Sequence, residues 1–260
     1  MNRLTGKTAL ITGASSGIGE TMARQLAALN CPLILVARRT DRLESLKSEL
    51  EQQHSIQVVT ISIDLSVPGS AQALYDQCQE QGLQVDILIN NAGFAKHGQM
   101  LDIPLAVHQE MMQLMVVTLT ELSYLFGQEM KQRQSGYIML VSSLLGFLPG
   151  PQFATYSAIK AYALNLADSL VREFKPQGIH ITALCPGGTA TEFMDVSGQK
   201  IEGLRNLAIM PSETVARSGL KALAKGQGNV VPGLLYKLSV IGLRLVPRNL
   251  QAVFGELATK

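Results

Sequence analysis

The amino-acid sequence predicts an α/β protein with one doubly wound parallel sheet of about seven strands and helices on both of its faces. Short β-branched or apolar runs alternate with longer amphipathic segments along the chain, as in repeated β-α units. Several short runs are apolar nearly throughout, which is expected of strands buried on both faces of a parallel sheet. No stretch rich in Pro, Gly or Ser divides the 260 residues, so we expect a single domain over residues 1–260.

Each element follows from its local pattern. The expected strands are 7–12, 32–37, 56–62, 85–90, 136–143, 178–185 and 229–231. The expected helices are 17–29, 40–53, 70–81, 105–132 and 154–174. Two regions depart from the alternation. Residues 187–210 follow a strand and are expected to form a substrate flap with short helices. Residues 232–250 form an apolar tail with scattered Lys and Arg, for which packing on the body is favoured over covering the substrate cleft or touching a membrane surface.

Composition excludes several classes of protein. The chain is 47% hydrophobic and 16% charged, so it can bury a substantial core. A net charge of +2, 5% aromatic residues and no Trp give no reason to expect a nucleic-acid partner. The three Cys and four His are too widely spaced for a disulfide framework or a metal site, and the histidines are expected on the surface or in loops. The apolar run near the N-terminus is too short for a signal peptide. We therefore expect a cytoplasmic protein.

The segment TGASSGIG (12–19) lies between the first expected strand and the first expected helix. Gly13 permits a tight turn, Gly17 lets backbone approach a pyrophosphate, and Gly19 lets the helix pack close to the sheet. The helix N-terminus presents free N–H groups to an anion. The spacing is G-x-x-x-G-x-G rather than the common G-x-G-x-x-G. The strand before it and the helix after it favour a Rossmann-type dinucleotide site over a simple glycine-rich turn.

The end of the second expected strand, VARRT (36–40), indicates which dinucleotide is used. In dinucleotide folds an acidic residue about 20 positions after the loop holds the ribose 2′-hydroxyl of NAD. Arg38 and Arg39 stand there instead. Arginine can pair bidentately with a 2′-phosphate, which favours NADP(H) over NAD(H). The alternative is a solvated arginine pair that begins the next helix.

The sequence contains, in order, TGASSGIG (12–19), DL (64–65), NNAG (90–93), SS (142–143), YSAIK (156–160) and PGGTATEF (186–193). This ordered set resembles the short-chain dehydrogenase/reductase family over essentially the whole chain. Any one motif is weak, but the set at these separations is highly specific. The ending after the second threonine of the last motif, with the VVPGLL tail, looks like the bacterial oxidoreductase-like members of the family.

The resemblance implies a role for each motif. The DL pair would lie by the adenine, NNAG would line the path of the cofactor, and the last motif would flank the nicotinamide and meet its carboxamide and the nearby phosphates. The complete set of residues expected to bind the cofactor is Gly13, Ser15, Ser16, Gly17, Ile18, Gly19, Arg38, Arg39, Asp64, Leu65, Asn91, Ala92, Gly93, Tyr156, Lys160, Pro186, Gly187, Thr189 and Thr191.

Tyr156 and Lys160 are four positions apart, which places them on the same face of a helix. A phenol with a pKa of about 10 is a poor proton shuttle near neutral pH, and a nearby ammonium lowers that pKa. Tyr156 is therefore expected to act as general acid in reduction and general base in oxidation. The resemblance implies that Lys160 also holds the nicotinamide ribose. Ser143, thirteen residues before Tyr156, matches the spacing of the catalytic serine of the family and would hydrogen-bond the substrate oxygen. Ser142 is a lesser candidate.

The long apolar helix 105–132 carries two further expectations. Aligned by its end, it places Met115 where the family often has an asparagine that shapes a proton route. This departure puts the proton relay in doubt, but not hydride transfer. The resemblance also suggests that the helices 105–132 and 154–174 pair with a second subunit, giving a homodimer or homotetramer.

Three functions remain open on the sequence alone. The favoured one is an NADP-dependent oxidoreductase that interconverts a carbonyl (a ketone, an aldehyde or a ketoacyl group) and a secondary alcohol. Its apolar carbonyl substrate would lie against the residues Phe94, Ser143, Leu144, Leu145, Phe147 and Phe153 and the flap. The second is an NADPH sensor without turnover, which Met115 alone supports. The third is a protein that contacts a membrane surface through residues 232–250.

Overall fold

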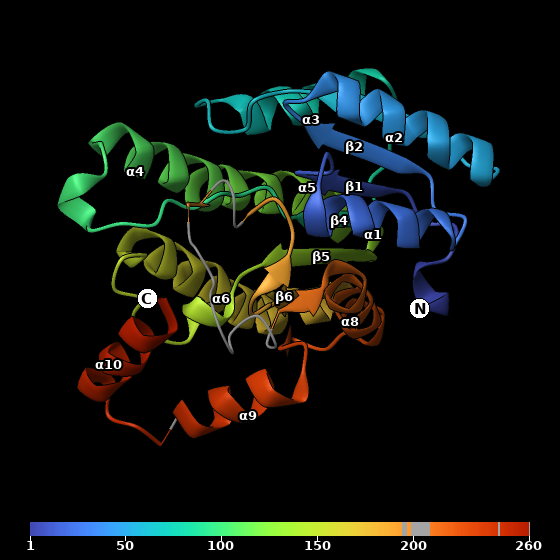
Figure 1. The fold of residues 1–260 in the computed structure, drawn as a ribbon. Coiled ribbons are helices and arrows are strands. Elements are labelled where there is room, and N and C mark those ends of the chain that lie inside the picture. Colours follow the sequence, from blue (N-terminus) through green and yellow to red (C-terminus); the bar gives the residue numbers. More distant parts are fainter. Residues whose placement is uncertain (194–196, 199–208, 244, 260) are drawn as a thin grey trace.

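The computed structural model of the protein describes residues 1–193, 197–198, 209–243 and 245–259 (Figure 1). Its central sheet has seven parallel strands in the order β3-β2-β1-β4-β5-β6-β9. The order reverses between β1 and β4, as in a doubly wound sheet. All the expected strands are confirmed, with slightly shorter bounds. They are β1 (Ala9–Thr12), β2 (Leu33–Ala37), β3 (Val58–Ser62), β4 (Ile87–Asn90), β5 (Gly136–Val141), β6 (Ile179–Leu184) and β9 (Asn229–Val230).

Helices cover both faces of this sheet (Figure 1). Along β1, Ala9 and Ile11 pack on one face while Leu10 packs on the other, because successive side chains of a strand point to opposite sides. Both sets are fully buried, which explains the unbroken apolar run. The first face is covered by α1 (Gly17–Ala27), α2 (Thr40–Gln53) and α8 (Ser212–Lys225). The second is covered by α3 (Ser70–Glu80), α5 (Leu119–Arg133) and α6 (Ala154–Phe174).

The long helix expected over 105–132 is built from three parts. An α-helix, α4 (Leu105–Met112), continues into a π-helical segment at Gln113–Thr118 and then into α5. Such π segments are rare and occur often at functional sites. This one carries Met115, whose side chain is buried.

The helix α8 was not expected from the sequence. Its buried face includes Val215, Gly219 and Leu223 at intervals of four residues, which is a regular helical pattern. Short 3₁₀ turns complete the body at Asn2–Leu4, Met100–Asp102, Leu144–Gly146 and Lys175–Gln177.

The two regions that depart from the alternation differ in how much of them is described. Of the flap expected over 187–210, residues 194–196 and 199–208 lie outside the described residues. On either side of them, β7 (Thr189–Ala190) pairs in parallel with β8 (Met210–Pro211).

The C-terminal part of the chain forms α9 (Leu234–Leu243) and α10 (Arg248–Thr259) at one end of the body (Figure 1). Tyr236 of α9 lies against Gly187, and Val240 is buried, so part of the expected packing is present. Large apolar side chains on the same helices remain exposed: Leu234, Leu235, Leu238, Ile241, Leu250, Val253 and Phe254. In the described ranges, no helix is both long enough and apolar enough to span a bilayer.

Candidate active site

The predicted site residues gather at the carboxyl ends of the central strands. The loops after β1 and β4 lie side by side because these two strands are neighbours in the sheet. The sheet order reverses at this pair, and ligands of doubly wound sheets bind in the crevice that such a reversal opens. The loop after β5 follows next along the same edge. These three loops carry the glycine segment, the NNAG motif and Ser143.

The glycine loop has the shape that close approach of a phosphate requires. Gly13 and Gly17 have φ angles of +67° and +58°, which side chains disfavour. A Cβ on Gly19 would lie 2.4 Å from the carbonyl oxygen of Gly13, so only glycine fits at this first turn of α1. The loop leads directly into the N-terminus of that helix, where free N–H groups face an anion. These features fit a dinucleotide cofactor.

Asn91 ties the glycine loop to the end of β4. Its side-chain amide donates to the carbonyl oxygens of Thr12, at 2.9 Å, and Gly13, at 3.3 Å. In return, the Thr12 hydroxyl oxygen accepts from the backbone N–H groups of Asn91 and Ala92, both at 3.0 Å. Asn91 therefore has a structural function in positioning the loop. Thr12, the first residue of the motif, is a positioning residue that the sequence analysis did not single out.

Gly93 marks the point where three parts of the site meet. A Cβ there would lie 2.7 Å from the sulfur of Met115 and 3.7 Å from Nζ of Lys160. Met115 therefore packs directly on the NNAG backbone, where the family resemblance placed an asparagine. Leu65 is buried in the core on the second face of the sheet, and its carbonyl oxygen accepts from the Thr118 hydroxyl of the π-helical segment at 2.9 Å.

The two arginines after β2 have different surroundings. Arg38 is largely exposed and pairs with Asp64 at 3.5 Å and Glu110 at 3.7 Å. Partial burial raises the pKa of the Asp64 carboxyl, but hydrogen bonds from Ser66 and the charge of Arg38 outweigh it, so the pKa is lowered.

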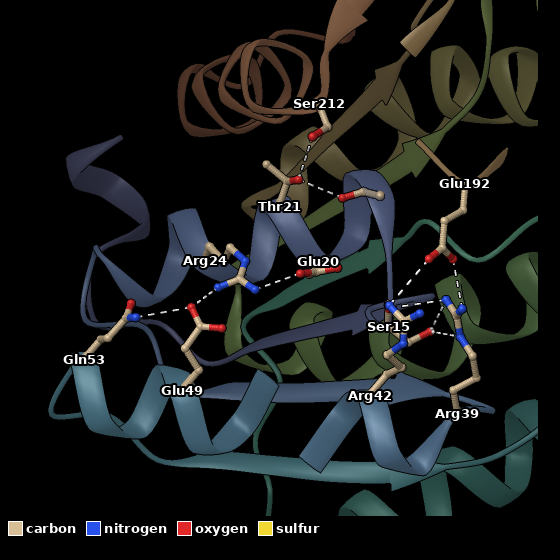
Figure 2. Close-up of polar contacts among 11 residues, drawn as sticks. Ser15, Glu20, Thr21, Arg24, Arg39, Arg42, Glu49, Gln53, Glu192 and Ser212 are labelled. Carbon is tan, nitrogen blue, oxygen red and sulfur yellow. Dashed lines mark hydrogen bonds and ion pairs between the residues drawn. The ribbon is translucent and has the colours of Figure 1, made fainter. Parts of the chain in front are cut away.

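Arg39 is anchored over the glycine loop (Figure 2). Its Nε and Nη2 atoms both donate to the Ser15 hydroxyl at 3.2 Å, and its Nη1 atom pairs with Glu192 at 2.9 Å. Both arginines follow β2, but Arg38 pairs with two acidic residues while Arg39 contacts Ser15 and Glu192. Only Arg39 contacts the glycine loop.

The structure brings Ser143, Tyr156 and Lys160 together. Ser143 directly follows β5, where its hydroxyl accepts from the Leu145 N–H at 3.2 Å and shares a hydrogen bond with the Tyr156 phenol. Tyr156 and Lys160 lie one turn apart on α6 and are 8% and 5% exposed. Ser142 is buried instead, and its hydroxyl donates to the backbone carbonyl of Lys160 at 2.7 Å. This contact makes Ser142 a structural residue.

The expected lowering of the phenol pKa by the lysine is wrong for this structure. Burial raises the pKa of Tyr156, and only the hydrogen bond to Ser143 opposes it. The Lys160 ammonium lies 5.4 Å from the centre of the Tyr156 ring and donates to the Val141 carbonyl at 2.8 Å. Burial also lowers the pKa of Lys160 to about 8. Both groups are therefore shifted toward their neutral forms by the same exclusion of water.

An apolar cluster encloses Tyr156. Phe153 and Phe193 place their ring centres 5.9 Å and 5.6 Å from that of Tyr156, and Phe94 and Leu145 pack on the same cluster. These are walls that the sequence analysis expected. Phe147 is an exception, since it packs against the core on the second face of the sheet.

His108 is a buried residue beside this cluster, although the histidines were expected on the surface or in loops. It lies on α4 and is 5% exposed, and its two buried ring nitrogens are hydrogen-bonded to the Thr155 hydroxyl, at 2.8 Å, and the Met100 carbonyl, at 3.1 Å. A small cavity beside Tyr156 is lined in part by His108, Met111 and Gln152. Nothing in the spacing of the histidines signals this position.

The residues after β6 close the site from the other side. The Pro186 carbonyl accepts from the Leu144 N–H at 2.8 Å, and the Thr189 hydroxyl donates to the Gly187 carbonyl at 3.1 Å. Thr191 faces Gly17, where a Cβ would lie 3.1 Å from the threonine side chain.

Tyr236, from α9, holds this turn from outside. Its ring lies so close to Gly187 that a Cβ there would be 2.3 Å away, and its hydroxyl accepts from the Gly188 N–H at 3.2 Å. Burial raises the pKa of this phenol. The sequence analysis placed no residue of the tail in the site, because the contact joins segments nearly fifty residues apart.

Comparisons with known proteins agree with this geometry. The sequence profile of the short chain dehydrogenase family matches residues 7–202. Oxidoreductase UcpA of Salmonella typhimurium is 34% identical over 192 residues, covering 74% of this chain and 72% of the relative. Very-long-chain 3-oxoacyl-CoA reductase of Rattus norvegicus is 25% identical over 265 residues, covering 94% and 81%. A solved short-chain dehydrogenase from Sphingobium yanoikuyae, in complex with NADPH, is 30% identical, with a TM-score of 0.82 over 95% of this chain and 98% of that one.

The profile match spans most of the chain, including every motif up to the segment after β6. Within that span the fold brings Ser143, Tyr156 and Lys160 together, with Nζ of Lys160 next to Gly93 of the NNAG motif. The chain therefore belongs to the short-chain dehydrogenase family of oxidoreductases.

Proposed function

We propose that the protein is an NADP(H)-dependent oxidoreductase that interconverts a carbonyl compound and a secondary alcohol. The observation that carries the proposal is the buried contact of Ser143, Tyr156 and Lys160 with one another, next to Gly93 of the NNAG motif. A nicotinamide cofactor supplies the hydride when it is bound. The protein must then supply a proton to the carbonyl oxygen during reduction and remove it during oxidation.

Tyr156 is the proton donor in this proposal. Burial raises its pKa, so the phenol is protonated near neutral pH and holds the proton that the reductive direction requires. Ser143 donates to the same substrate oxygen as negative charge develops there. Lys160 lies beside the phenol and Gly93, within the predicted path of the cofactor, where its ammonium would hold the nicotinamide ribose.

The preference for NADP(H) rests on the arginines at the end of β2. Arg39 is held over the glycine loop by Ser15, close to where the adenosine end of the cofactor would lie. The relative from Sphingobium yanoikuyae is in complex with NADPH, which is consistent with this assignment. Arg38 is exposed next to Asp64, and an aspartate in its place should weaken NADPH binding more than NADH binding. Equal losses for the two cofactors in a fluorescence titration would contradict a role of Arg38 at the 2′-phosphate.

The substrate class follows from the surroundings of Tyr156. Two aromatic rings, Met111 and Met115 enclose the phenol, and such walls fit an apolar carbonyl compound such as a ketone or a ketoacyl thioester. The rat relative is a 3-oxoacyl-CoA reductase by name. We further propose that the protein acts on a small molecule, is cytoplasmic, and forms a homodimer or homotetramer.

The direct test is NADPH consumption by the purified protein with a panel of ketones, aldehydes and β-ketoacyl thioesters. Turnover of at least one apolar class supports the proposal. Tight NADPH binding with no turnover across the panel would contradict it and favour the sensor function instead. In that case Met115→Asn would be the variant to examine next.

A further inference from the structure

A carboxylate of the protein itself is bound between two arginines at the edge of the predicted cofactor site. One oxygen of Glu192 pairs with Nη1 of Arg39 at 2.9 Å, and the other lies 3.5 Å from Nη1 of Arg42 (Figure 2). Arg39 is in turn fixed to Ser15. The hydrogen bond from Arg39 is the largest interaction that lowers the pKa of the Glu192 carboxyl, and the two arginine charges and a hydrogen bond from Ser16 add to it.

Glu192 reaches this position from the opposite side of the crevice. It belongs to the segment after β6, whereas Arg39 and Arg42 lie at the start of α2. Its neighbours in the chain contact the predicted cofactor path at two other points. Thr191 packs on Gly17 of the glycine loop, and Phe193 packs on the Tyr156 ring. Residues 191–193 therefore extend from the glycine loop to the predicted proton donor.

The partners of Glu192 form a site for an anion with more than one oxygen. Two guanidinium groups converge on its carboxylate. Arginine pairs bind phosphate groups with the same geometry as carboxylates. A phosphate monoester carries between one and two negative charges near neutral pH, so it should compete effectively with a single carboxylate for this site. The predicted ligand that carries such a group is NADP(H).

We propose that Glu192 is an internal anion that occupies the 2′-phosphate site, and that Arg39 and Arg42 release it when they bind the 2′-phosphate of NADP(H). This inference rests on the proposed function, and it adds Arg42 and Glu192 to the residues that determine cofactor specificity. NADH has no 2′-phosphate to replace the carboxylate on the arginines. Glu192 therefore weakens NADPH binding by competition, while its contacts with the arginines tie the segment after β6 to α2 when no phosphate is present.

The test uses binding rather than turnover. Adenosine 2′,5′-bisphosphate and adenosine 5′-monophosphate differ by the 2′-phosphate alone, and calorimetry measures both on the full-length protein. The Glu192→Gln substitution removes the competing charge and should tighten binding of the bisphosphate by about fivefold, the scale of exposed ion pairs. Binding of the monophosphate should not change. Glu49→Gln is the matched control, because Glu49 pairs with Arg24 on the same face of the protein, away from Ser15 (Figure 2).

Each other outcome has a distinct meaning. If the wild type prefers the bisphosphate but Glu192→Gln binds it no better, the inference is wrong and the NADP(H) assignment stands. If Glu192→Gln weakens the monophosphate, Glu192 is instead an acceptor for the ribose hydroxyl, and the inference is overturned. If neither the wild type nor the variant distinguishes the two ligands, both the inference and the NADP(H) preference fail. A preference that is gained only in Glu192→Gln supports the competition but contradicts NADP(H) as the preferred cofactor of the wild type.

Discussion

At the scale of single residues, burial shifts the two central ionisable groups of the site toward their neutral forms. It raises the pKa of Tyr156 and lowers that of Lys160 to about 8. A protonated phenol near neutral pH suits the reductive direction. The burial of the charged Lys160 ammonium costs folding free energy. Its hydrogen-bond acceptor is the Val141 carbonyl.

This cost makes a prediction about stability. Since the pKa of Lys160 is about 8 in the fold against 10.5 for the free side chain, the unfolded chain binds more protons between these pH values. The free energy of unfolding should therefore rise with pH over that window. Replacing Lys160 by Met removes the buried charge and should stabilise the cofactor-free protein at pH 7. The gain is at most about 3 kcal/mol, less about 1 kcal/mol for the lost hydrogen bond.

Urea unfolding at pH 7 and at pH 9.5 measures this effect. The wild type should gain stability relative to Lys160→Met as the pH rises, because the penalty on its charged form disappears. Lys221→Met, on the exposed face of α8, is the control and should behave as the wild type does. If wild type and Lys160→Met had equal pH dependence, the buried lysine would carry no such cost.

How much of the site the sequence predicts depends on where the contacts come from. The spacing of Tyr156 and Lys160 is local and carries a chemical rationale, the family resemblance pointed to Ser143, and the structure brings the three together. The motifs also placed the glycine loop and Asn91 correctly at one edge of the sheet. Three contacts were missed because they join distant segments: Glu192 with the arginines, Tyr236 with Gly188, and Thr155 with His108. No pattern in one sequence contains these pairs.

At the scale of elements, the sequence predicts the strands better than it predicts the break in the long helix. A strand buried on both faces reads as an unbroken apolar run, and all the expected strands lie where the runs are. The π-helical segment at Gln113–Thr118 has no such signature, since one extra residue in a helical turn leaves the composition unchanged. It is visible only in the backbone of the folded chain.

The first turn of α1 offers a test of the glycine loop. In Gly19→Ala the new Cβ would meet the Gly13 carbonyl oxygen at 2.4 Å, so the loop must shift at a cost of about 1–3 kcal/mol. NADPH binding should be lost together with this stability. The control is Gly242→Ala in α9, where no atom lies within 4 Å of a new Cβ. It should be neutral or should stabilise by about 0.5–1 kcal/mol.

Urea unfolding and an NADPH fluorescence titration give both quantities for the two variants. If Gly19→Ala had the same stability and the same NADPH affinity as the wild type, the loop would tolerate a side chain at this position. The close approach of α1 to the loop would then not be required for binding.

At the scale of the whole molecule, two of the surfaces that carry exposed apolar side chains bear on assembly. One runs over the outer faces of the π segment, α5 and α6 and includes Val117, Tyr124 and Tyr162. The other, on α9 and α10, includes Leu238, Ile241 and Phe254. Exposed apolar surface of this kind marks interfaces, and the predicted subunit contact uses the first surface.

Light scattering at micromolar concentration should therefore give the mass of two or four chains. The double variant Tyr124→Lys, Tyr162→Lys places charges on the first surface and should lower that mass. The double variant Leu238→Lys, Ile241→Lys on the second surface should leave it unchanged. A wild-type mass of one chain would contradict the homo-oligomer, and sensitivity to the second pair alone would move the interface to the C-terminal helices.

The central claim is that the Tyr156 phenol transfers the proton in an oxidoreductase reaction. The most direct measurement is the rate of NADPH oxidation with a ketone or ketoacyl substrate that the wild type reduces. The variants Tyr156→Phe and Tyr162→Phe are compared with the wild type. Tyr162 is on the same helix, and its hydroxyl is bonded only to Thr120 among the contacts of the described residues. We expect a loss of about 10²-fold to 10⁴-fold in turnover for Tyr156→Phe, with NADPH binding retained, and little change for Tyr162→Phe. Unchanged turnover in Tyr156→Phe would contradict the claim.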